Sequence, residues 1–123
     1  MKTLTVNGQN NCFQVDQGWM DAFQNTGAST VLEPGMYVLR IKSGNFSYAS
    51  GRASEALVLI WIYGGKFINY KTNVETTTTW SSLNGYDDTI TLEVKETTTV
   101  CAALLDTNKY DNSGEIVVSI LDA

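Results

Sequence analysis

The chain of 123 residues contains no histidine, one proline and only two cysteines. Without histidine it lacks the commonest general base and the commonest zinc ligand, which excludes Ser-His-Asp and Cys-His nucleophilic chemistry. Cys12 and Cys101 stand far apart in the sequence, and they either bridge an N-terminal strand to a late strand or remain buried free thiols. We favour free thiols, because nothing else in the sequence is typical of a secreted chain.

Basic charge and long apolar runs are scarce as well. The 8 Lys and Arg residues are outnumbered by 13 Asp and Glu, so the net charge is −5 and no basic footprint exists for nucleic acid. The longest apolar run, Ala56–Tyr63, is too short to cross a bilayer, and residues 1–20 lack the apolar centre of a signal peptide. We therefore expect a soluble protein that is cytoplasmic or released without a signal peptide.

Helical periodicity is the last notable absence, because Ala, Leu, Glu and Lys never cluster in the sequence. Short runs rich in Thr, Val and Ile, separated by turn residues, instead predict an all-β chain of roughly nine to eleven strands. No shift in composition divides the chain, so we predict a single domain over residues 1–123.

Alternation of apolar and polar residues gives the clearest strands. In Met36–Ser43, Tyr37, Leu39 and Ile41 share one face until Gly44 ends the pattern, and Thr89–Val94 alternates in the same way. The other predicted strands are Lys2–Val6, Cys12–Asp16, Ser29–Leu32, the wholly apolar Ala56–Tyr63, Lys66–Tyr70, Thr99–Leu105 and Ile116–Leu121.

Several segments connect these strands or fit two structures. We predict a turn at Asn25–Gly27 and a hairpin turn at Gly64-Gly65. Gln17–Phe23 fits either one helical turn or a loop anchored in the core, and Thr72–Thr79 fits either an edge strand or an exposed loop.

The three tryptophans are candidates for stacking on sugar rings, because aromatic faces pack on the apolar faces of sugars. We expect Trp61 and Trp19 to lie in the core, since Trp61 belongs to the apolar run. Trp80 lies in a polar, Thr-rich stretch, so both core packing and ligand contact remain open for it.

The stretch from Asp106 to Gly114 is the most informative motif. It lies between two predicted strands and contains five side chains with oxygen atoms: Asp106, Asn108, Asp111, Asn112 and Ser113. Calcium takes six to eight oxygen ligands in irregular geometry, which such a loop can supply. The same residue types also form ordinary hairpin turns, so both interpretations remain open.

Two segments together resemble one protein family. The first runs from Pro34-Gly35 through the strand to the sequence Ser-Gly-Asn-Phe-Ser-Tyr at 43–48, and the second contains Asp106, the sequence Asp-Asn-Ser-Gly at 111–114 and the strand that follows. They resemble the soluble, calcium-dependent galactophilic lectins of bacteria, the PA-I type. The resemblance implies a jelly-roll-like β-sandwich of the galactose-binding-like kind, a calcium cofactor, and a sugar bound through two hydroxyls on the ion.

The resemblance also implies a set of calcium ligands. Tyr48 and Asn108 would give backbone carbonyls. Asp106 and Asp111 would give carboxylates, and Asn112 would give its side-chain amide oxygen. The loop between Asp106 and Asp111 is two residues shorter than the family's, which bears on the position of Asn108. Asp111 stands where the family has an amide, and its added negative charge favours a divalent cation.

Sugar contacts follow from the same resemblance at Asp106, Thr107, Asp111 and Asn112. Two further residues keep two interpretations each. Tyr110 either touches the ligand or packs down as a loop anchor. Arg52 either donates hydrogen bonds to the ligand or is a solvated loop charge.

The loop after Tyr48 departs from the family. In the family it is long and carries a His and a Gln that help hold galactose, whereas here it is reduced to Ala49–Glu55 and has neither residue. We therefore expect a lectin-like protein for a galactose-type or other diol-bearing sugar, assembled as a homo-oligomer that gives avidity. The alternative is a non-lectin β-sandwich that is structural or binds a partner, with or without calcium.

An enzyme is the remaining class to consider. Asp87 and Asp88 suggest a two-carboxylate glycosidase, but an acidic pair beside Asn84-Gly85 is more simply explained as a turn. We expect no catalytic activity.

Overall fold

A computed structural model describes residues 1–26 and 28–123 of the chain. Most of its ordered elements are strands, so the predicted all-β class is confirmed. In chain order the elements are α1 (Gln17–Asn25), β1 (Ser29–Leu32), β2 (Gly35–Ser47), β3 (Leu57–Asn69), β4 (Val74–Asn84), β5 (Thr89–Val94), β6 (Thr98–Ala103), the single-turn helix η1 (Lys109–Asp111) and β7 (Ser113–Asp122).

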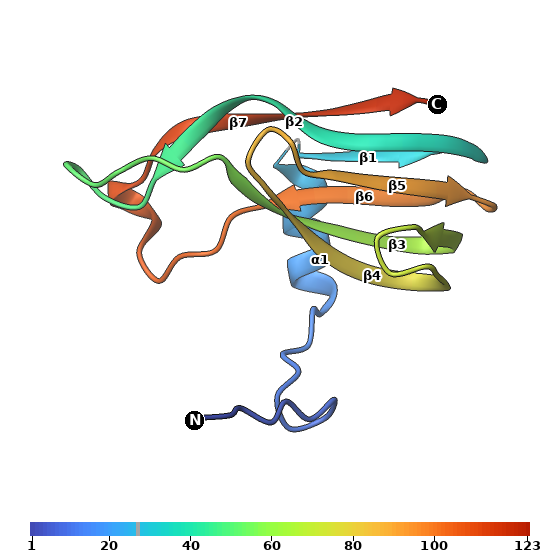
Figure 1. The fold of residues 1–123 in the computed structure, drawn as a ribbon, viewed down its shortest axis with the longest axis horizontal. Helices are drawn as coiled ribbons and strands as arrows, with labels where there is room; N and C mark the ends of the chain where they lie inside the picture. The colour runs from blue at the N-terminus through green and yellow to red at the C-terminus, as the bar shows by residue number, and fades with distance from the viewer. Residues whose placement is uncertain (27) are drawn as a thin grey trace.

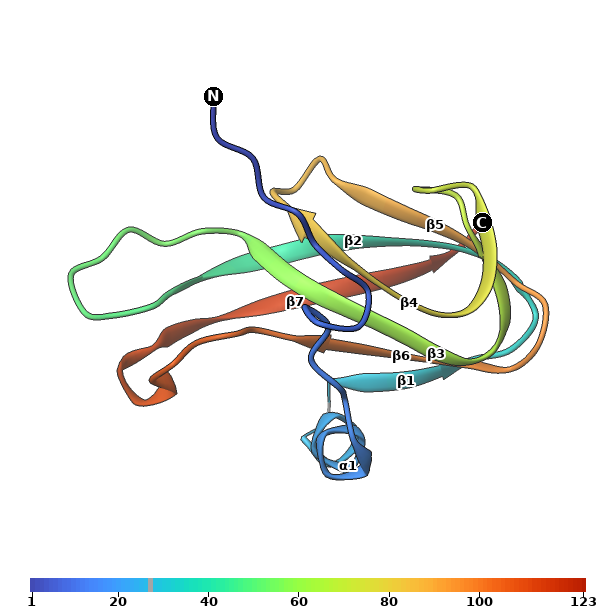
Figure 2. The same ribbon diagram turned by 90° about the horizontal axis from the view of Figure 1, so that it is seen from below.

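The strands form one antiparallel sheet that curls on itself (Figures 1 and 2). Its order is β1-β6-β3-β5-β2-β7, and β4 pairs with the other edge of β3. The seven strands of the described residues are fewer than predicted, because two predicted N-terminal strands do not form and the two predicted over Ala56–Tyr63 and Lys66–Tyr70 fuse into β3. A two-layer jelly roll stays a prediction, since the strands belong to one continuous sheet.

The fusion is clearest at Gly64-Gly65, where the predicted hairpin turn is wrong. β3 continues through both glycines, and its register with β4 shifts between Tyr63 and Phe67. Before the shift β3 pairs with β6, and after it β3 pairs with β5. The two glycines therefore form an irregularity at which one strand changes its neighbour, as bulges commonly do.

The core lies inside the curl of the sheet. The alternation predicted for β2 and β5 is confirmed, because Leu39, Ile41, Ile90 and Leu92 are all fully buried. β3 contributes Val58, Ile60, Ile62 and Phe67 from one face, and β7 packs Ile116, Val118 and Ile120 against them. The residues of β3 that point outward, such as Trp61, are only half-buried, so the core position predicted for Trp61 is wrong.

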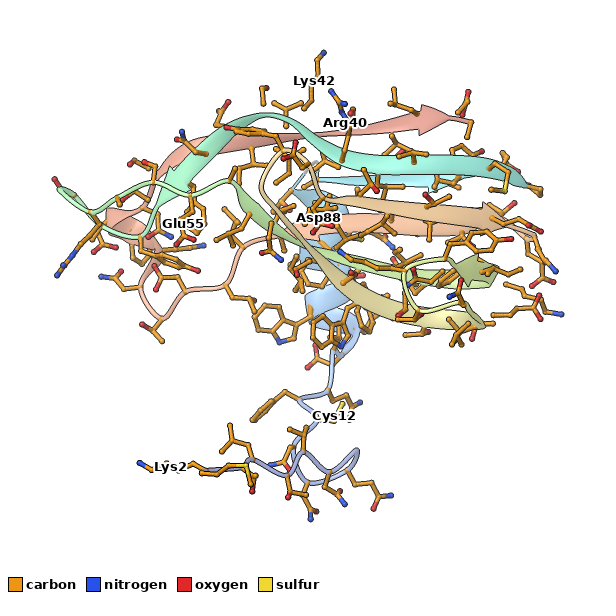
Figure 3. The ribbon with its side chains drawn as sticks, in the orientation of Figure 1. Lys2, Cys12, Arg40, Lys42, Glu55 and Asp88 are labelled. Carbon is orange, nitrogen blue, oxygen red and sulfur yellow. The ribbon has the colours of Figure 1, made fainter. Side chains whose placement is uncertain are left out.

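The N-terminal predictions are wrong. Neither Lys2–Val6 nor Cys12–Asp16 forms a strand, and Leu4 is 94% exposed. Figures 1 and 3 show this segment, with Lys2 and Cys12, leaving the sheet instead of pairing with it. Alternation alone favoured a strand here, but a strand needs a neighbour to supply its hydrogen bonds, and the segment meets none within the described residues.

The segment Gln17–Phe23 belongs to α1. The helix begins where the side chain of Asp16 accepts a hydrogen bond of 3.0 Å from the backbone N–H of Trp19, as a helix cap does. It contacts β1 and β6 from outside the curl (Figure 2), and Trp19 is 55% exposed, which contradicts its predicted core position. The turn predicted at Asn25–Gly27 reaches Gly27, which lies outside the described residues. No helix in the described ranges is long and apolar enough to cross a membrane.

The two cysteines are free, as predicted, although only Cys101 is buried and Cys12 is exposed. Burial raises the pKa of the Cys101 thiol, while hydrogen bonds with Ser29 and Tyr63 act in the opposite direction. Its thiol therefore stays protonated at neutral pH and serves as packing.

Gly44 and Gly114 allow β2 and β7 to approach closely. The sequence predicted that this strand ends at Gly44, but β2 continues to Ser47, which lies opposite Ser113. Gly44 has a φ of +94°, and a Cβ atom there would collide with the carbonyl of Glu115, while one on Gly114 would collide with the carbonyl of Asn45. Both positions need glycine because backbone atoms occupy the space of a side chain.

We predict that Gly44→Ala lowers the free energy of unfolding by about 2 kcal/mol or more, because backbone strain and a collision with backbone atoms add together. Gly51→Ala is the matched control, since Gly51 has a φ of +76° but open space around it and should lose only about 1 kcal/mol. Urea unfolding of both variants measures the difference. Equal losses in the two would show that the approach of β7 imposes no constraint.

Candidate metal and ligand site

The end of the β2–β7 pair brings together two of the predicted calcium ligands. The pairing finishes with Ser47 opposite Ser113, so Tyr48 and Asn112 are the next residues on the two strands. The loops that follow β2 and precede β7 lie at the same end of the sheet in Figures 1 and 2. The sheet register therefore places these two residues beside each other although they are far apart in sequence.

The β2–β3 loop is held by its own hydrogen bonds. The buried hydroxyl of Ser47 donates to the carbonyls of Ala49 at 2.8 Å and Arg52 at 3.1 Å. Farther along, Phe46 and Glu55 exchange two backbone hydrogen bonds of 2.9 Å, which close the loop near the label of Glu55 in Figure 3. The exposed Arg52 thus lies in a shaped turn next to Tyr48, whose ring packs edge-on against Phe46 with 4.6 Å between the ring centroids.

The loop from Asp106 to Asn112 is folded by side-chain hydrogen bonds. Oδ1 of Asp106 accepts from the backbone N–H groups of Thr107 at 2.7 Å and Asn108 at 3.3 Å. Oδ1 of Asn108 in turn accepts from the backbone N–H of Tyr110 at 3.2 Å and caps η1. These turns follow from Asp and Asn, whose short side chains reach backbone groups one to two residues ahead.

Asn112 has the most informative side chain in the loop. Its backbone N–H donates to the carbonyl of Lys109 at 3.2 Å, which orients the residue at the start of β7. Its side-chain Oδ1 is buried and has no hydrogen-bond partner among the described residues. Buried polar atoms nearly always have a partner, so this oxygen is suited to accept a donor or cation from outside the chain.

The remaining predicted residues of the loop are exposed. Asp111 is exposed within η1, and Thr107 is exposed at the loop tip. Tyr110 is 89% exposed with the Lys109 ammonium 5.8 Å from its ring centroid, so the interpretation of Tyr110 as a packed loop anchor is wrong. No group of three or more His, Cys, Asp or Glu side chains that could hold a metal occurs in the described ranges.

The oxygen atoms of the loop are nevertheless of the chemical types that a hard cation binds. Two carboxylates, one buried amide oxygen and the backbone carbonyls beside them are the ligand types that calcium takes in proteins. Such a site depends on carbonyl and amide oxygens as much as on acidic side chains, so a cluster of three acids is not required.

Comparisons with protein-family models, with curated proteins and with solved structures found no match. The resemblance to galactophilic lectins therefore stays a prediction, and function has to be argued from the geometry.

Of the other acidic candidates, Asp88 has a structural role in the turn that the sequence predicted beside Asn84-Gly85. Asp88, which is labelled in Figure 3, pairs with the Lys71 ammonium at 3.1 Å and accepts from the backbone N–H of Asn84 at 3.0 Å. Burial alone raises the pKa of Asp88, but the hydrogen bonds from Asn84, Lys71 and Thr89 outweigh it and leave the pKa below its ordinary value of 3.8. Asp88 therefore ties the β4–β5 turn to Lys71 as an ionised carboxylate.

We predict that Asp88→Asn lowers the free energy of unfolding at pH 7 by about 1 kcal/mol, because the ion pair and the charged acceptor are lost. A carboxylate with a lowered pKa stabilises the fold above its unfolded-state pKa, and this contribution disappears as the pH falls through the folded-state pKa. The difference between Asp88→Asn and the parent should therefore shrink below about pH 4. Urea unfolding at pH 7 and pH 3 measures it, with the exposed Asp87→Asn as control. A difference that is as large at pH 3 as at pH 7 contradicts the assignment.

Proposed function

We propose that the chain is a calcium-dependent, lectin-like carbohydrate-binding protein. The observation that carries this proposal is the buried, unpartnered Oδ1 of Asn112 next to Tyr48 at the end of the β2–β7 pair. A hard cation at this point would satisfy the amide oxygen and lie within a loop already supplied with two carboxylates.

The ligands of the ion would be the carboxylates of Asp106 and Asp111, the amide oxygen of Asn112, and the backbone carbonyls of Tyr48 and Asn108. Five protein oxygens leave coordination positions open, since calcium takes six to eight. Two neighbouring hydroxyls of a sugar can replace water in those positions. When bound, calcium supplies a point of attachment for such a diol, and the chain holds the ion and shapes its surroundings.

Side chains near the ion would set the affinity for the sugar. Thr107, Tyr110 and Arg52 are exposed around the site and offer a hydroxyl, an aromatic ring and a guanidinium group. The short Ala49–Glu55 loop provides few further contacts, so affinity for a galactose-type monosaccharide should be about millimolar, or roughly −4 kcal/mol. Useful avidity then requires several sites in a homo-oligomer. The proposal assigns binding without catalysis, and the net charge of −5 argues against nucleic acid as the ligand.

A second candidate function is a partner-binding or structural module that needs no ion. One observation favours it: Asp106 and Asn108 already use a side-chain oxygen to fold the loop through its own backbone N–H groups. A loop held by these internal hydrogen bonds can also serve as a structural clasp. The two candidates differ in whether calcium binds the folded chain.

We predict that calcium raises the melting temperature, adding about 3 kcal/mol of stability at one hundred times the dissociation constant, because it binds only the folded loop. Thermal unfolding with calcium and with chelator measures the effect. Asp106→Asn is the sharpest variant, since it retains Oδ1 for the backbone N–H of Thr107 and removes only the charge, so it should weaken the response. Asp106→Ala should abolish it, Asp111→Asn should reduce it, and Asp87→Asn should leave it unchanged. Identical curves in calcium and chelator would mean that no calcium site exists.

We further predict that calcium adds a sugar-binding component with a dissociation constant of about 1 mM for galactose. Titration calorimetry in calcium and in chelator isolates this component. Asp106→Ala should remove it, and a deoxy sugar without neighbouring hydroxyls should not show it. If Asp106→Ala keeps the whole calcium-dependent component, the sugar does not bind at this loop.

A further inference from the structure

The outer face of β3 and β4 carries a pair of tryptophans away from the candidate calcium loop. Ile60 and Ile62 point into the core, so the alternation of β3 places Trp61 and Tyr63 on the outside. The register with β4 sets Trp80 directly opposite Trp61. Trp80 is 65% exposed although it lies in the middle of a strand of eleven residues. A large aromatic ring is thus presented to solvent on a regular, hydrogen-bonded support.

We propose that Trp80 is the centre of a second carbohydrate site, which binds the apolar face of a neutral pyranose without calcium. Stacking on an indole ring needs a flat, exposed aromatic side chain held by a rigid element, and β4 provides both. Trp61 lies opposite Trp80 on the neighbouring strand, and its own ring lies 6.5 Å from the ring of Tyr63 between centroids.

The chemistry around Trp80 suits a ligand rich in hydroxyl groups. The residues two positions away on the same face, Thr78 and Ser82, carry hydroxyls, and each can donate and accept. Near Ser82 the charges of Lys71 and Asp88 neutralise each other, which favours a neutral ligand.

A strand from a second copy of the chain is the main competing occupant, because β4 is an edge of the sheet. Side chains of the chain itself already occupy much of that edge. The backbone N–H of Thr78 donates to Oγ1 of Thr76, the carbonyl of Ser82 accepts from Lys71 at 2.8 Å, and the backbone N–H of Asn84 donates to Asp88. An added strand would have to displace these bonds, whereas a sugar on the ring of Trp80 leaves them intact.

The test is titration of the full chain in chelator with lactose, cellobiose and maltose, followed by tryptophan fluorescence and by calorimetry. Chelator removes any contribution of the calcium loop, so this site and the proposed calcium site fail or succeed separately. We expect at least one of the three disaccharides to bind and to shift the emission. Trp80→Ala should weaken that binding at least tenfold, and Trp80→Tyr should restore part of it.

Phe13→Ala is the matched control, because Phe13 is an exposed aromatic residue of the N-terminal segment, which leaves the sheet (Figure 1). It should change the affinity less than twofold, and melting curves of all variants verify that they fold. Absence of binding by all three sugars in chelator would overturn the proposal, as would equal losses in the two alanine variants. Sedimentation showing a dimer that Trp80→Ala dissociates would overturn it too, because a second copy would then cover the ring.

Discussion

The structure depends on the close approach of β3 to the turn between β5 and β6. A Cβ atom on Gly65 would collide with the carbonyls of Glu96 and Thr97, so only glycine lets the strand pass there. The next residue, Lys66, accepts at its carbonyl from the backbone N–H groups of Lys95 and Glu96 at 2.9 and 3.0 Å, and its own N–H donates to the Glu96 carboxylate at 2.9 Å. Because β3 is fixed at this point, it can pair with β6 before it and with β5 after it, which curls the sheet around one core.

That curl places the two candidate sites on separate parts of the molecule. β2 and β7 pair at the far edge from β4, and their shared end carries Tyr48 and Asn112. The tryptophan pair lies on the outer face of the β3–β4 edge. The proposed calcium site would depend on loop oxygens and an ion, and the second proposed site on an exposed ring held by a strand, so loss of one should leave the support of the other unchanged.

Local pattern in the sequence predicted the all-β class, the buried faces of β2 and β5, and β1, because alternation reports directly on a half-buried strand. It failed where the outcome depends on distant partners. Lys2–Val6 has a strand-like pattern and no neighbour, while Gly64-Gly65 has the composition of a turn but lies within a strand that two neighbours hold. Trp61 was expected in the core because Ala56–Tyr63 is apolar on both faces, so composition could not separate inside from outside. The residue types of the Asp106–Asn112 loop were enough to make it a candidate metal site. The unpartnered oxygen of Asn112 and the ion pair of Asp88 with Lys71 could be seen only in the structure.

The loop's own hydrogen bonds are compatible with a bound ion, because its oxygen atoms have enough lone pairs for both. A carboxylate has two oxygens and about four lone pairs, so Asp106 can accept two backbone N–H groups at Oδ1 and still offer oxygen to a cation. Asn108 would contribute its carbonyl, whereas its side chain is the part that caps η1. The internal bonds therefore order the loop in advance, which reduces the conformational entropy that the loop would otherwise lose when it binds an ion. Asn112 differs, because its buried amide oxygen accepts nothing within the described chain and is left unsatisfied until something from outside arrives. In the proposed calcium site this oxygen would be a ligand of the ion, whereas in a loop that served only as a clasp it would need a water or a donor from outside the chain.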